Sequence, residues 1–462
     1  MNVKKLILLV VCPCVILPLY AQEAVMQFSV SEAQEYAVKH NRELQNVRED
    51  VNIADEQYKA ARGQGLPQIS GKLDYMTNFN YEAELEFGSS DQSSTPDVDF
   101  SLLDEGDYEI MKVLESMTST GPTTIKMTDQ ANAQIQVSQL IFGGQYWVGL
   151  ATAKIGRQLA QQNVNITELD VRESIANTYY MILVTEQIVD VLNKNIDNLE
   201  EIKQHTQNMY KAGLAEEVDV DQISISQSQL DNQKKAMERN LNLTYHMLHF
   251  QMGLDYDQEI ELTDSLDALM DDLEISTKLA VSFEPAQNPQ YQIMETQEAM
   301  QEKQIEMEKW AYAPRLTGFY TYTEKIMTTG FDLNPKNAAG LNLSIPIFSS
   351  GVRKANLDKA RIELDKAQRQ KEMLKEQLLM QNNQLRYELT NALENYQTQK
   401  DNVKVARRVL ENVQNKYTQG LASSLDLTQA NSNYLEAESN YLNAARELMQ
   451  ANLKLEKLYD QL

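Results

Sequence analysis

Four histidines and many acidic side chains are the residues of this chain that could support chemistry. His246 and His249 are three residues apart, so on a helix they would share one face and could bind one metal ion. No third ligand follows at a defined spacing, and solvated or packed helix positions are the alternative. The 67 aspartate and glutamate residues are spread along the sequence, and no pair stands out as a general acid and base.

Glycines and cysteines do not indicate a chemical site either. Gly63-Gln-Gly65 ends an expected helix before Leu66-Pro67, which is the wrong order for a phosphate-binding loop and suits a helix end. Both cysteines, Cys12 and Cys14, fall within residues 1–21. We therefore expect no catalytic residues, no cofactor and no metal site, and hence no enzyme.

Residues 1–21 predict a secretory signal peptide. Lys4 and Lys5 precede an apolar run from Leu6 to Tyr20, and the small residue Ala21 suits cleavage. The run is shorter than the roughly twenty apolar residues that a membrane-spanning helix needs. An uncleaved anchor helix is the alternative. The residue after the expected cleavage point is glutamine rather than cysteine, so we expect no N-terminal lipid.

Turn-forming residues are scarce and clustered. The chain has only 17 glycines and 10 prolines, and no proline occurs between Pro122 and Pro285 or after Pro346. These two tracts are therefore expected to be mainly helical. The formal net charge of -25 argues against binding nucleic acid or anionic lipid through a basic surface.

The sequence also repeats itself. The segment from Tyr210 to Gln222 matches the segment from Tyr417 to Gln429 without a gap, and each contains a Gly-Leu pair after the tyrosine. Upstream, the segment that begins at Ser138 recurs at Ser344. We therefore expect an internal duplication.

Each half of the sequence predicts the same order of elements. The first repeat, 22–280, has a helix, a strand pair at about 67–142, a long helix at 145–212, a returning helix at 216–254 and a linker. The second repeat, 281–462, has a helix, a strand pair at about 314–348, a long helix at 352–419 and a returning helix at 423–461. Each long helix would span roughly 100 Å. No single globule buries that length, so the helices must pack along one another as a coiled coil.

A stripe of small and apolar residues supports the coiled coil. Along 392–417, the residues of the stripe are spaced alternately by four and three positions. An earlier register of the same kind runs along 357–378, and two successive spacings of four join the two registers. The later stripe consists of Ala392, Tyr396, Gln399, Val403, Ala406, Leu410, Val413 and Tyr417. The earlier stripe consists of Leu357, Ala360, Leu364, Ala367, Lys371, Leu374 and Leu378.

Four segments are expected to be strands. Three alternate between apolar and polar residues, as at Ile69 and Leu73, Ile135 and Val137, or 341–347, whereas 315–323 has no clear sidedness. Their length of about ten residues and their two faces fit strands that cross a bilayer. Four strands cannot close a barrel, so several chains must share one. A soluble sheet with one wet face is the alternative.

Residues 88–124 form an acidic insertion within the first strand pair. Its acids include Asp97, Asp99, Asp104, Glu105, Asp107 and Glu109. We expect a surface loop here, with a short helix near 108–117. The second strand pair has no equivalent insertion.

In this order, the segments resemble the TolC-like outer-membrane efflux family over essentially the whole chain after the signal peptide. The resemblance rests on Ser29-Val-Ser-Glu32 as a capping box, the Asn41 region, Leu66-Pro67 before a strand, Ile141-Phe142-Gly143-Gly144 after one, and the repeated Tyr-x-x-Gly-Leu turns. It implies a mainly α fold with a small β portion. A long α-helical coiled-coil barrel and four transmembrane strands per chain would complete a twelve-stranded barrel as a homotrimer.

The resemblance also implies a function and partners. The chain would be a subunit of a passive duct in the bacterial outer membrane, extending into the periplasm as part of a tripartite efflux or secretion system. A periplasmic adaptor protein and an inner-membrane transporter would open it, and outer-membrane lipid would surround its strands. The alternative is a periplasmic adaptor or coiled-coil scaffold protein. An adaptor has one hairpin between small β domains, whereas this sequence predicts two hairpins and four barrel-type strands.

The resemblance further assigns residues to the periplasmic tip, where such a duct opens. An aspartate that lines the entrance in the family stands at Asp426, and Asp219 and Asp221 would supply acids from the first half, whereas Gln429 replaces a second acid of some members. The start of a helix, where acids favour the positive end of its dipole, is the alternative role of Asp219 and Asp426. The turn residues that would shape the tip and contact the adaptor are Tyr210, Gly213, Leu214, Tyr417, Gly420 and Leu421.

Overall fold

The computed structural model of the chain is mainly helical with a small strand portion, as the sequence predicts. It describes residues 25–77, 79, 81–85, 112, 123–127, 129–271, 273, 275–327 and 335–462. The expected signal peptide, 1–21, lies outside this described part. So does most of the expected acidic loop, 88–124, with its helix near 108–117.

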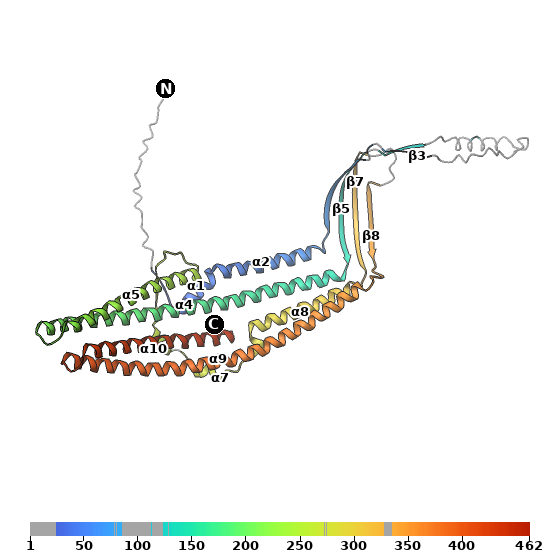
Figure 1. The fold of residues 1–462 in the computed structure, drawn as a ribbon. Coiled ribbons are helices and arrows are strands. Elements are labelled where there is room, and N and C mark those ends of the chain that lie inside the picture. Colours follow the sequence, from blue (N-terminus) through green and yellow to red (C-terminus); the bar gives the residue numbers. More distant parts are fainter. Residues whose placement is uncertain are drawn as a thin grey trace, which may run out of the picture. The chain divides into compact units, whose positions relative to one another are not determined.

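Two very long helices dominate the fold (Figure 1). These helices, α4 and α9, have 68 and 67 residues, and each is followed by a turn and a returning helix, α5 or α10. Among the described helices, none combines the length and apolar character that a bilayer crossing needs. The bounds are α1 Val30–His40, α2 Arg42–Gly63, α4 Gly144–Lys211, α5 Glu217–Met252, α6 Leu266–Asp271, α7 Ile275–Ala280, the 3-10 helix η2 Pro285–Gln287, α8 Pro289–Trp310, α9 Val352–Thr418 and α10 Ser424–Leu458.

The described strands form three sheets. The largest is antiparallel with the order β2-β5-β7-β8, so it combines strands from both halves of the sequence. β3 pairs with β4, and β1 pairs with β6 in parallel. The bounds are β1 Met26–Phe28, β2 Gln68–Met76, β3 Tyr81–Leu85, β4 Thr123–Met127, β5 Gln130–Phe142, β6 Ile260–Leu262, β7 Arg315–Met327 and β8 Asn337–Ser344.

The chain divides into two compact units. The helical unit comprises residues up to Ala54, Gly156–Ala299 and Asp365–Leu462, and the strand unit comprises Asp55–Ile155 and Met300–Leu364. This division differs from the two expected sequence repeats, because each repeat contributes segments to both units. The helices α2, α4, α8 and α9 each contribute residues to both units.

A capping box fixes the start of α1. The Ser29 hydroxyl accepts the backbone N–H of Glu32 at 3.3 Å, and the Ser29 backbone N–H donates to Glu32 Oε2 at 2.8 Å. These bonds satisfy amides that the first turn of a helix leaves free. The bonds from Ser29 hold the pKa of the Glu32 carboxyl below its usual value. The capping box predicted from the sequence is therefore confirmed.

The predicted coiled-coil stripe of α9 is confirmed. The positions of both registers turn inward, and several of them are buried. The buried members are Tyr396, Val403, Leu410 and Tyr417 in the later register and Ala360, Ala367 and Leu378 in the earlier one. Because the spacing alternates between three and four residues, these positions form one seam along the helix.

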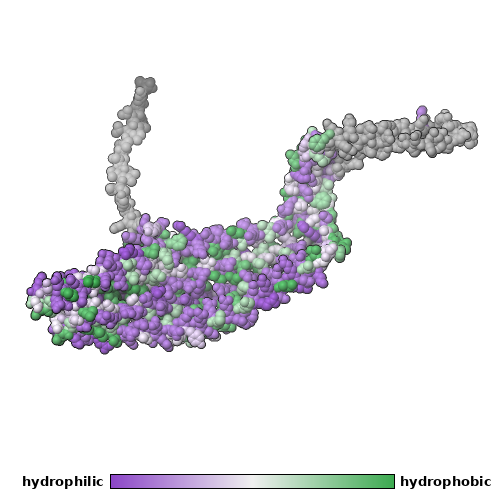
Figure 2. Space-filling model, in the orientation of Figure 1, coloured by the Kyte–Doolittle hydropathy of each residue, from purple (hydrophilic) through white to green (hydrophobic). Residues whose placement is uncertain are grey.

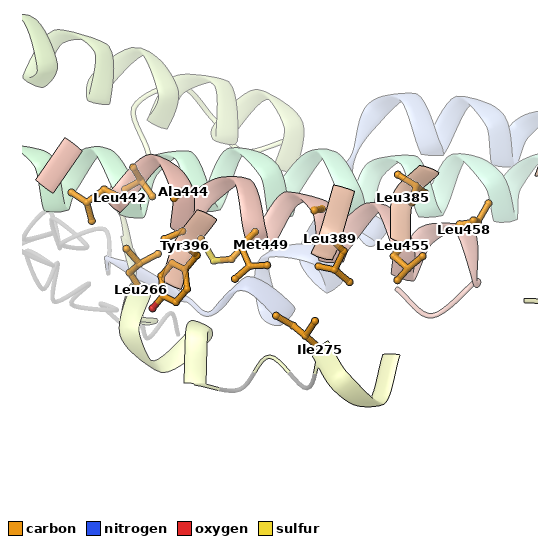
Figure 3. Packing of buried hydrophobic residues seen from close by; sticks show 14 of the residues in the cluster. Leu266, Ile275, Leu385, Leu389, Tyr396, Leu442, Ala444, Met449, Leu455 and Leu458 are labelled. Atoms are coloured by element: carbon orange, nitrogen blue, oxygen red, sulfur yellow. The ribbon is translucent and has the colours of Figure 1, made fainter. Parts of the chain in front are cut away.

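The largest apolar cluster of the helical unit lies between α4, α9 and α10 (Figure 3). Leu389, Leu448 and Met449 are almost fully buried there, and Leu266 and Ile275 add the short helices α6 and α7 to the cluster. Full burial of one such side chain contributes roughly 1.5–3 kcal/mol. The linker between the sequence halves is thus part of the core.

Tyr179 of α4 fixes the small β1–β6 sheet. Its hydroxyl donates to the carbonyl oxygen of Phe28 at 2.9 Å and accepts the backbone N–H of Asp264 at 3.3 Å. The ring is fully buried, and burial raises the pKa of the hydroxyl. The sequence does not predict this sheet, because its strands are too short to show a period.

Gly253 ends α5 in a conformation that alanine adopts only with strain. Its φ is 74°, and an added Cβ would overlap the backbone carbonyl oxygen of His40. We expect Gly253→Ala to destabilise the protein by about 1–3 kcal/mol or more, because backbone strain and the clash add. Unfolding followed by circular dichroism measures the difference.

Gly156→Ala is the matched control for this substitution. An added Cβ at Gly156, inside α4, would meet nothing within 4 Å. Alanine is favoured over glycine in a helix by roughly 0.5–1 kcal/mol, so this variant should be at least as stable as the original protein. Equal stability of the two variants would contradict the role of Gly253.

Candidate functional site

The four-stranded sheet has one apolar face. The register pairs Ile69 of β2 with Val137 of β5, and Val137 with Tyr320 of β7. Directly paired residues lie on the same face, so the apolar positions of neighbouring strands join. Gln139, Glu324 and Asn337 also lie on this face. Its apolar and small residues are Ile69, Gly71, Leu73 and Tyr75 of β2, Ala131, Ala133, Ile135 and Val137 of β5, Leu316, Gly318, Tyr320 and Tyr322 of β7, and Ala339, Leu341 and Leu343 of β8. The register thereby defines the sidedness of β7, which the sequence leaves open.

The opposite face is mainly polar, although Leu140 and Phe319 also lie on it. It carries Ser70, Lys72 and Asp74 of β2, Asn132, Gln134, Gln136 and Ser138 of β5, Thr317, Thr321 and Thr323 of β7, and Asn342 and Ser344 of β8. On the apolar face, Ile69 and Leu73 each expose 73% of their surface and Leu341 exposes 69%. An exposed apolar face opposite a polar one suits lipid on one side and water on the other.

Both edges of this sheet lack a partner strand within the described part of the chain. β2 pairs with β5 alone, and β8 pairs with β7 alone. The outer backbone N–H and C=O groups of these two strands can therefore pair with strands of other chains.

The two Gly-Leu turns of the helical unit have the same backbone geometry. Gly213 and Gly420 have φ values of 76° and 75°. The backbone N–H of Leu214 donates to the carbonyl oxygen of Met209 at 2.8 Å, and Leu421 makes the corresponding bond at 2.8 Å. A glycine in the left-handed region with this bond is a Schellman motif, which ends a helix. Both glycines therefore end the long helices.

Asp219 and Asp426 lie in the first turns of the returning helices. Asp426 Oδ2 accepts the backbone N–H of Ser423 at 3.0 Å and its hydroxyl at 2.8 Å, and these bonds hold the pKa of the Asp426 carboxyl below its usual value. Asp219 Oδ2 accepts the backbone N–H of Glu216 at 3.1 Å. Both aspartates thus cap helices, while Asp426 and Asp221 also face solvent.

Buried polar side chains join the two hairpins near the turns. The Ser424 hydroxyl of α10 lies 2.6 Å from Asp219 Oδ1 and 2.6 Å from Gln222 Oε1 of α5, so two acceptors share its proton. The Tyr417 hydroxyl of α9 is hydrogen-bonded to the Thr206 hydroxyl of α4 at 2.8 Å. Ser424, Tyr417 and Thr206 are all buried.

A reciprocal amide pair forms another link between α4 and α10. Asn195 Nδ2 donates to Asn431 Oδ1 at 2.7 Å, and Asn431 Nδ2 donates to Asn195 Oδ1 at 2.9 Å. Each residue exposes only 5% of its surface, beside an apolar cluster that includes Leu192, Leu199 and Leu427. A buried polar pair inside an apolar seam fixes the register of the helices that carry it.

The turn residues differ in exposure although their sequences match. Tyr210 exposes 45% of its surface, Leu214 exposes 74% and Leu421 exposes 73%. Tyr417 exposes only 6%, and burial raises the pKa of its hydroxyl. The first three therefore offer surface to a partner, whereas Tyr417 packs between the helices.

His246 and His249, the two histidines that could share a metal ion, are engaged in packing or in backbone bonds. His246 stacks on Tyr256 with the ring centroids 4.1 Å apart. His249 Nδ1 and Nε2 each lie 2.6 Å from a backbone carbonyl oxygen, that of Tyr245 and that of Gln258. Neither nitrogen of His249 therefore points to open space. Within the described residues, no group of three His, Cys, Asp or Glu side chains could hold a metal ion.

The family of the chain follows from a comparison with family models. The model described as Outer membrane efflux protein matches residues 35–253 and 284–459. The chain belongs to this family. The family predicted from the repeated turns is thus confirmed, and with it the function as an outer-membrane efflux channel and the location in the outer membrane. No curated protein matches the sequence.

Solved outer-membrane channels share the fold of this efflux protein. CusC aligns with a TM-score of 0.71 and 13% identity, over 93% of this chain and 92% of its own. The Campylobacter jejuni channel CmeC aligns with a TM-score of 0.67 and 15% identity, over 93% and 85%. The open state of the Neisseria gonorrhoeae channel MtrE aligns with a TM-score of 0.67 and 15% identity, over 93% and 88%. At these identities the likeness shows the fold alone.

The polar links between the hairpins of this efflux protein are not predicted from the sequence. Asn195 and Thr206 belong to an apolar stripe of α4 with alternating spacing, together with Leu192, Leu199 and Ile202. A polar residue that interrupts such a stripe is the signal that could have found them. Their partners on α9 and α10 depend on the packing of separate helices, which no local motif encodes.

The asparagine pair predicts a non-additive pair of substitutions. Asn195→Leu alone leaves the Asn431 amide buried without a partner, so it should destabilise the protein by about 1–3 kcal/mol. The double variant Asn195→Leu/Asn431→Leu removes both polar groups and should recover much of that loss. Denaturant unfolding of the two single variants and the double variant measures the coupling.

Asn440→Leu is the matched control, because Asn440 is an exposed asparagine on the same helix α10. It should change the free energy of unfolding by less than about 0.5 kcal/mol. If the losses in the free energy of unfolding caused by Asn195→Leu and Asn431→Leu simply add in the double variant, the two asparagines do not stabilise the protein as a pair.

Proposed function

We propose that three copies of this efflux protein form one passive duct, with a twelve-stranded barrel in the outer membrane and a helical tunnel in the periplasm. The observation that carries this proposal is the sheet with one apolar face, one polar face and two edges that lack partners within the described chain. Unpaired backbone groups in lipid cost several kcal/mol each, which disfavours a lone sheet. Three such sheets, joined edge to edge, would pair every strand.

We also infer that residues 22–280 and 281–462 are structural repeats. The long helices have 68 and 67 residues, and the returning helices have 36 and 35. The turns between them share one hydrogen-bond pattern. Each repeat would supply one strand pair and one hairpin, so that a trimer surrounds its tunnel with six similar hairpins.

The proposed periplasmic entrance lies at the turns of these hairpins. Asp426 and Asp221 face solvent there, and Asp219 lies beside them at the start of α5. Three copies of these carboxylates around one axis would attract cations. Their mutual repulsion would raise the pKa of Asp426, against the lowering by Ser423 in each chain.

An adaptor and an inner-membrane transporter are the proposed partners that open the entrance. Tyr210, Leu214 and Leu421 offer exposed side chains for the adaptor, and Gly213 and Gly420 shape the turns on which they lie. The hydrogen bonds that link the hairpins would have to break as the hairpins separate. Each hydrogen bond contributes only about 0.5–1.5 kcal/mol net, because water can replace the partner. Binding of the partners can supply that free energy.

The decisive experiment is electrical recording with the oligomer mass measured in parallel. The mature protein, extracted in detergent and reconstituted into a planar bilayer, should be trimeric and should give discrete conductance steps that favour cations. A monomer without conductance would contradict the proposal and favour a periplasmic adaptor or scaffold protein.

Asp426→Asn tests the entrance within the working channel. Asparagine keeps a side-chain acceptor for the helix cap but removes the charge. We expect weaker block by divalent cations and a lower preference for cations, with unchanged oligomer mass. Single-channel recording across a salt gradient measures both.

Asp365→Asn is the control, because Asp365 is an exposed acid of α9 outside the turns. Divalent cations should block the Asp365→Asn channel as strongly as they block the original channel. Equal effects of the two substitutions would assign the cation preference to the general charge of the protein rather than to the entrance.

A further inference from the structure

The helical unit contains a cavity of about 550 Å³ at the place where α10 ends and α8 begins. Leu458 is the last residue of α10 and Pro289 is the first residue of α8, so the row that these two helices form is interrupted beside α4 and α9. Cavities of this size hold small ligands in many proteins. The cavity is therefore a candidate binding site.

Hydrogen bonds between the helices keep this cavity open. Asn288 Nδ2 donates to the carbonyl oxygen of Leu458 at 3.0 Å, and Asn288 Oδ1 accepts the backbone N–H of Gln290 at 3.0 Å. The Tyr459 hydroxyl, just after α10, donates to Asn382 Oδ1 of α9 at 2.8 Å. These bonds hold the end of α10 against α8 and α9, so they oppose closure of the space. A site that is formed before binding loses less entropy when a ligand enters.

The cavity has an apolar floor and a polar rim. Leu169, Leu385 and Leu458 line it and are buried, and the last two belong to the apolar cluster of Figure 3. Gln377 and Gln381 of α9 also line it but are exposed, and their side-chain amides have no hydrogen-bond partner among the described residues. The visible face of the helices is mainly hydrophilic, as Figure 2 shows, so an accessible apolar floor is unusual there. Such a cavity suits an amphiphilic ligand.

Two side chains of opposite charge at the cavity are available to a ligand. Lys457 is engaged, because its Nζ lies 2.5 Å from Asp170 Oδ1 and 2.6 Å from Glu173 Oε2 of α4. Lys454 Nζ is 3.9 Å from Glu388 Oε2, and these two side chains expose 51% and 40% of their surface. An exposed ion pair at this distance contributes little to stability, so a ligand can replace it at a low cost.

We propose that the cavity binds a small zwitterion with an apolar body, such as a hydrophobic amino acid. The carboxylate of the ligand would contact Lys454, its ammonium group would contact Glu388, and its apolar body would lie on Leu385 and Leu458. A ligand with one charge would satisfy only one of the two charged side chains. A ligand without an apolar body would leave the floor of the cavity in water.

The cavity would face the proposed tunnel, so this inference rests on the proposed function. Arg386 of α9 donates to the backbone carbonyl oxygens of Leu279 and Val281, at the end of the linker helix α7. Gln377 precedes Arg386 by nine residues, roughly two and a half helical turns, so it lies on the opposite face of α9. Linker helices from three copies would obstruct a tunnel if they lay inside it. The linker therefore belongs outside, and the ligand would be a molecule in transit.

Saturation-transfer difference NMR with the protein in lipid nanodiscs tests the class of ligand. L-Phenylalanine should bind. Phenethylamine lacks the carboxylate and 3-phenylpropionate lacks the ammonium group, so each should bind about tenfold more weakly. Glycine lacks the apolar body and should not compete with L-phenylalanine. Equal affinities of the three phenyl compounds, or equal signals from empty nanodiscs, would overturn the site.

Glu388→Gln and Lys454→Gln assign the two charges. Glu388→Gln should weaken the binding of L-phenylalanine about tenfold but should not weaken that of 3-phenylpropionate, which has no ammonium group. Lys454→Gln should weaken the binding of both carboxylates but not that of phenethylamine. A merely structural role of these side chains would weaken the binding of all three ligands equally, which would contradict the proposal.

Glu394→Gln is the matched control for Glu388→Gln. Glu394 is an exposed acid of the same helix α9, and it lies outside the lining of the cavity. L-Phenylalanine should bind this variant as tightly as the original protein. Equal weakening by the two substitutions would assign the effect to the general charge of the helix and overturn the contact with Glu388.

Single-channel recording separates this inference from the proposed function. L-Phenylalanine should lower the conductance of the original channel, and the same concentration should have less effect on Glu388→Gln. A conducting channel that does not bind L-phenylalanine overturns the site alone, whereas a protein that binds it without conducting contradicts the proposed duct. Binding that leaves the conductance unchanged would overturn the place of the cavity in the tunnel wall.

Discussion

Backbone N–H and C=O groups cannot remain unpaired where water is excluded, and in this efflux protein that constraint falls on β2 and β8. The exposed apolar face beside them makes the sheet unsuitable for water, and the two open edges make it unsuitable for lipid as a single chain. The proposed pairing with the edges of other copies would solve both problems. Since α4 begins two residues after β5 ends, closure of the proposed barrel would also determine where this long helix starts.

The helical unit changes its chemistry along the seam between the hairpins. Beside the linker helices the seam is apolar, with Leu389 and Met449 almost fully buried. Toward the turns it contains hydroxyl and amide links, including Tyr417 with Thr206. Separating apolar side chains costs the whole transfer free energy, whereas water can replace a hydrogen-bond partner. These links lie beside an apolar cluster that includes Leu199 and Leu427, so separation of the hairpins at the turns would also expose apolar surface.

Local and periodic signals in the sequence made much of the fold predictable. The packing of separate helices against one another was not predictable from such signals. The capping box of Ser29 needs only neighbouring residues, and the seam through Tyr396 is a one-dimensional repeat. The sidedness of Tyr320 was not predictable, because threonine and tyrosine suit both faces of a sheet. The link between Asn195 and Asn431 requires α4 and α10 to meet in one particular register, which no sequence window contains.

The repeated turns also show that matching sequence does not guarantee matching roles. Tyr417 can be buried because its hydroxyl is hydrogen-bonded to the Thr206 hydroxyl on α4. At the corresponding place on α9 the chain has Val413, which offers no hydroxyl, and Tyr210 is exposed. The first hairpin therefore presents a tyrosine to its surroundings, while the second uses the same residue for internal packing. A partner that contacts the turns would meet two different surfaces, so six similar hairpins in a trimer would offer it a threefold rather than a sixfold pattern.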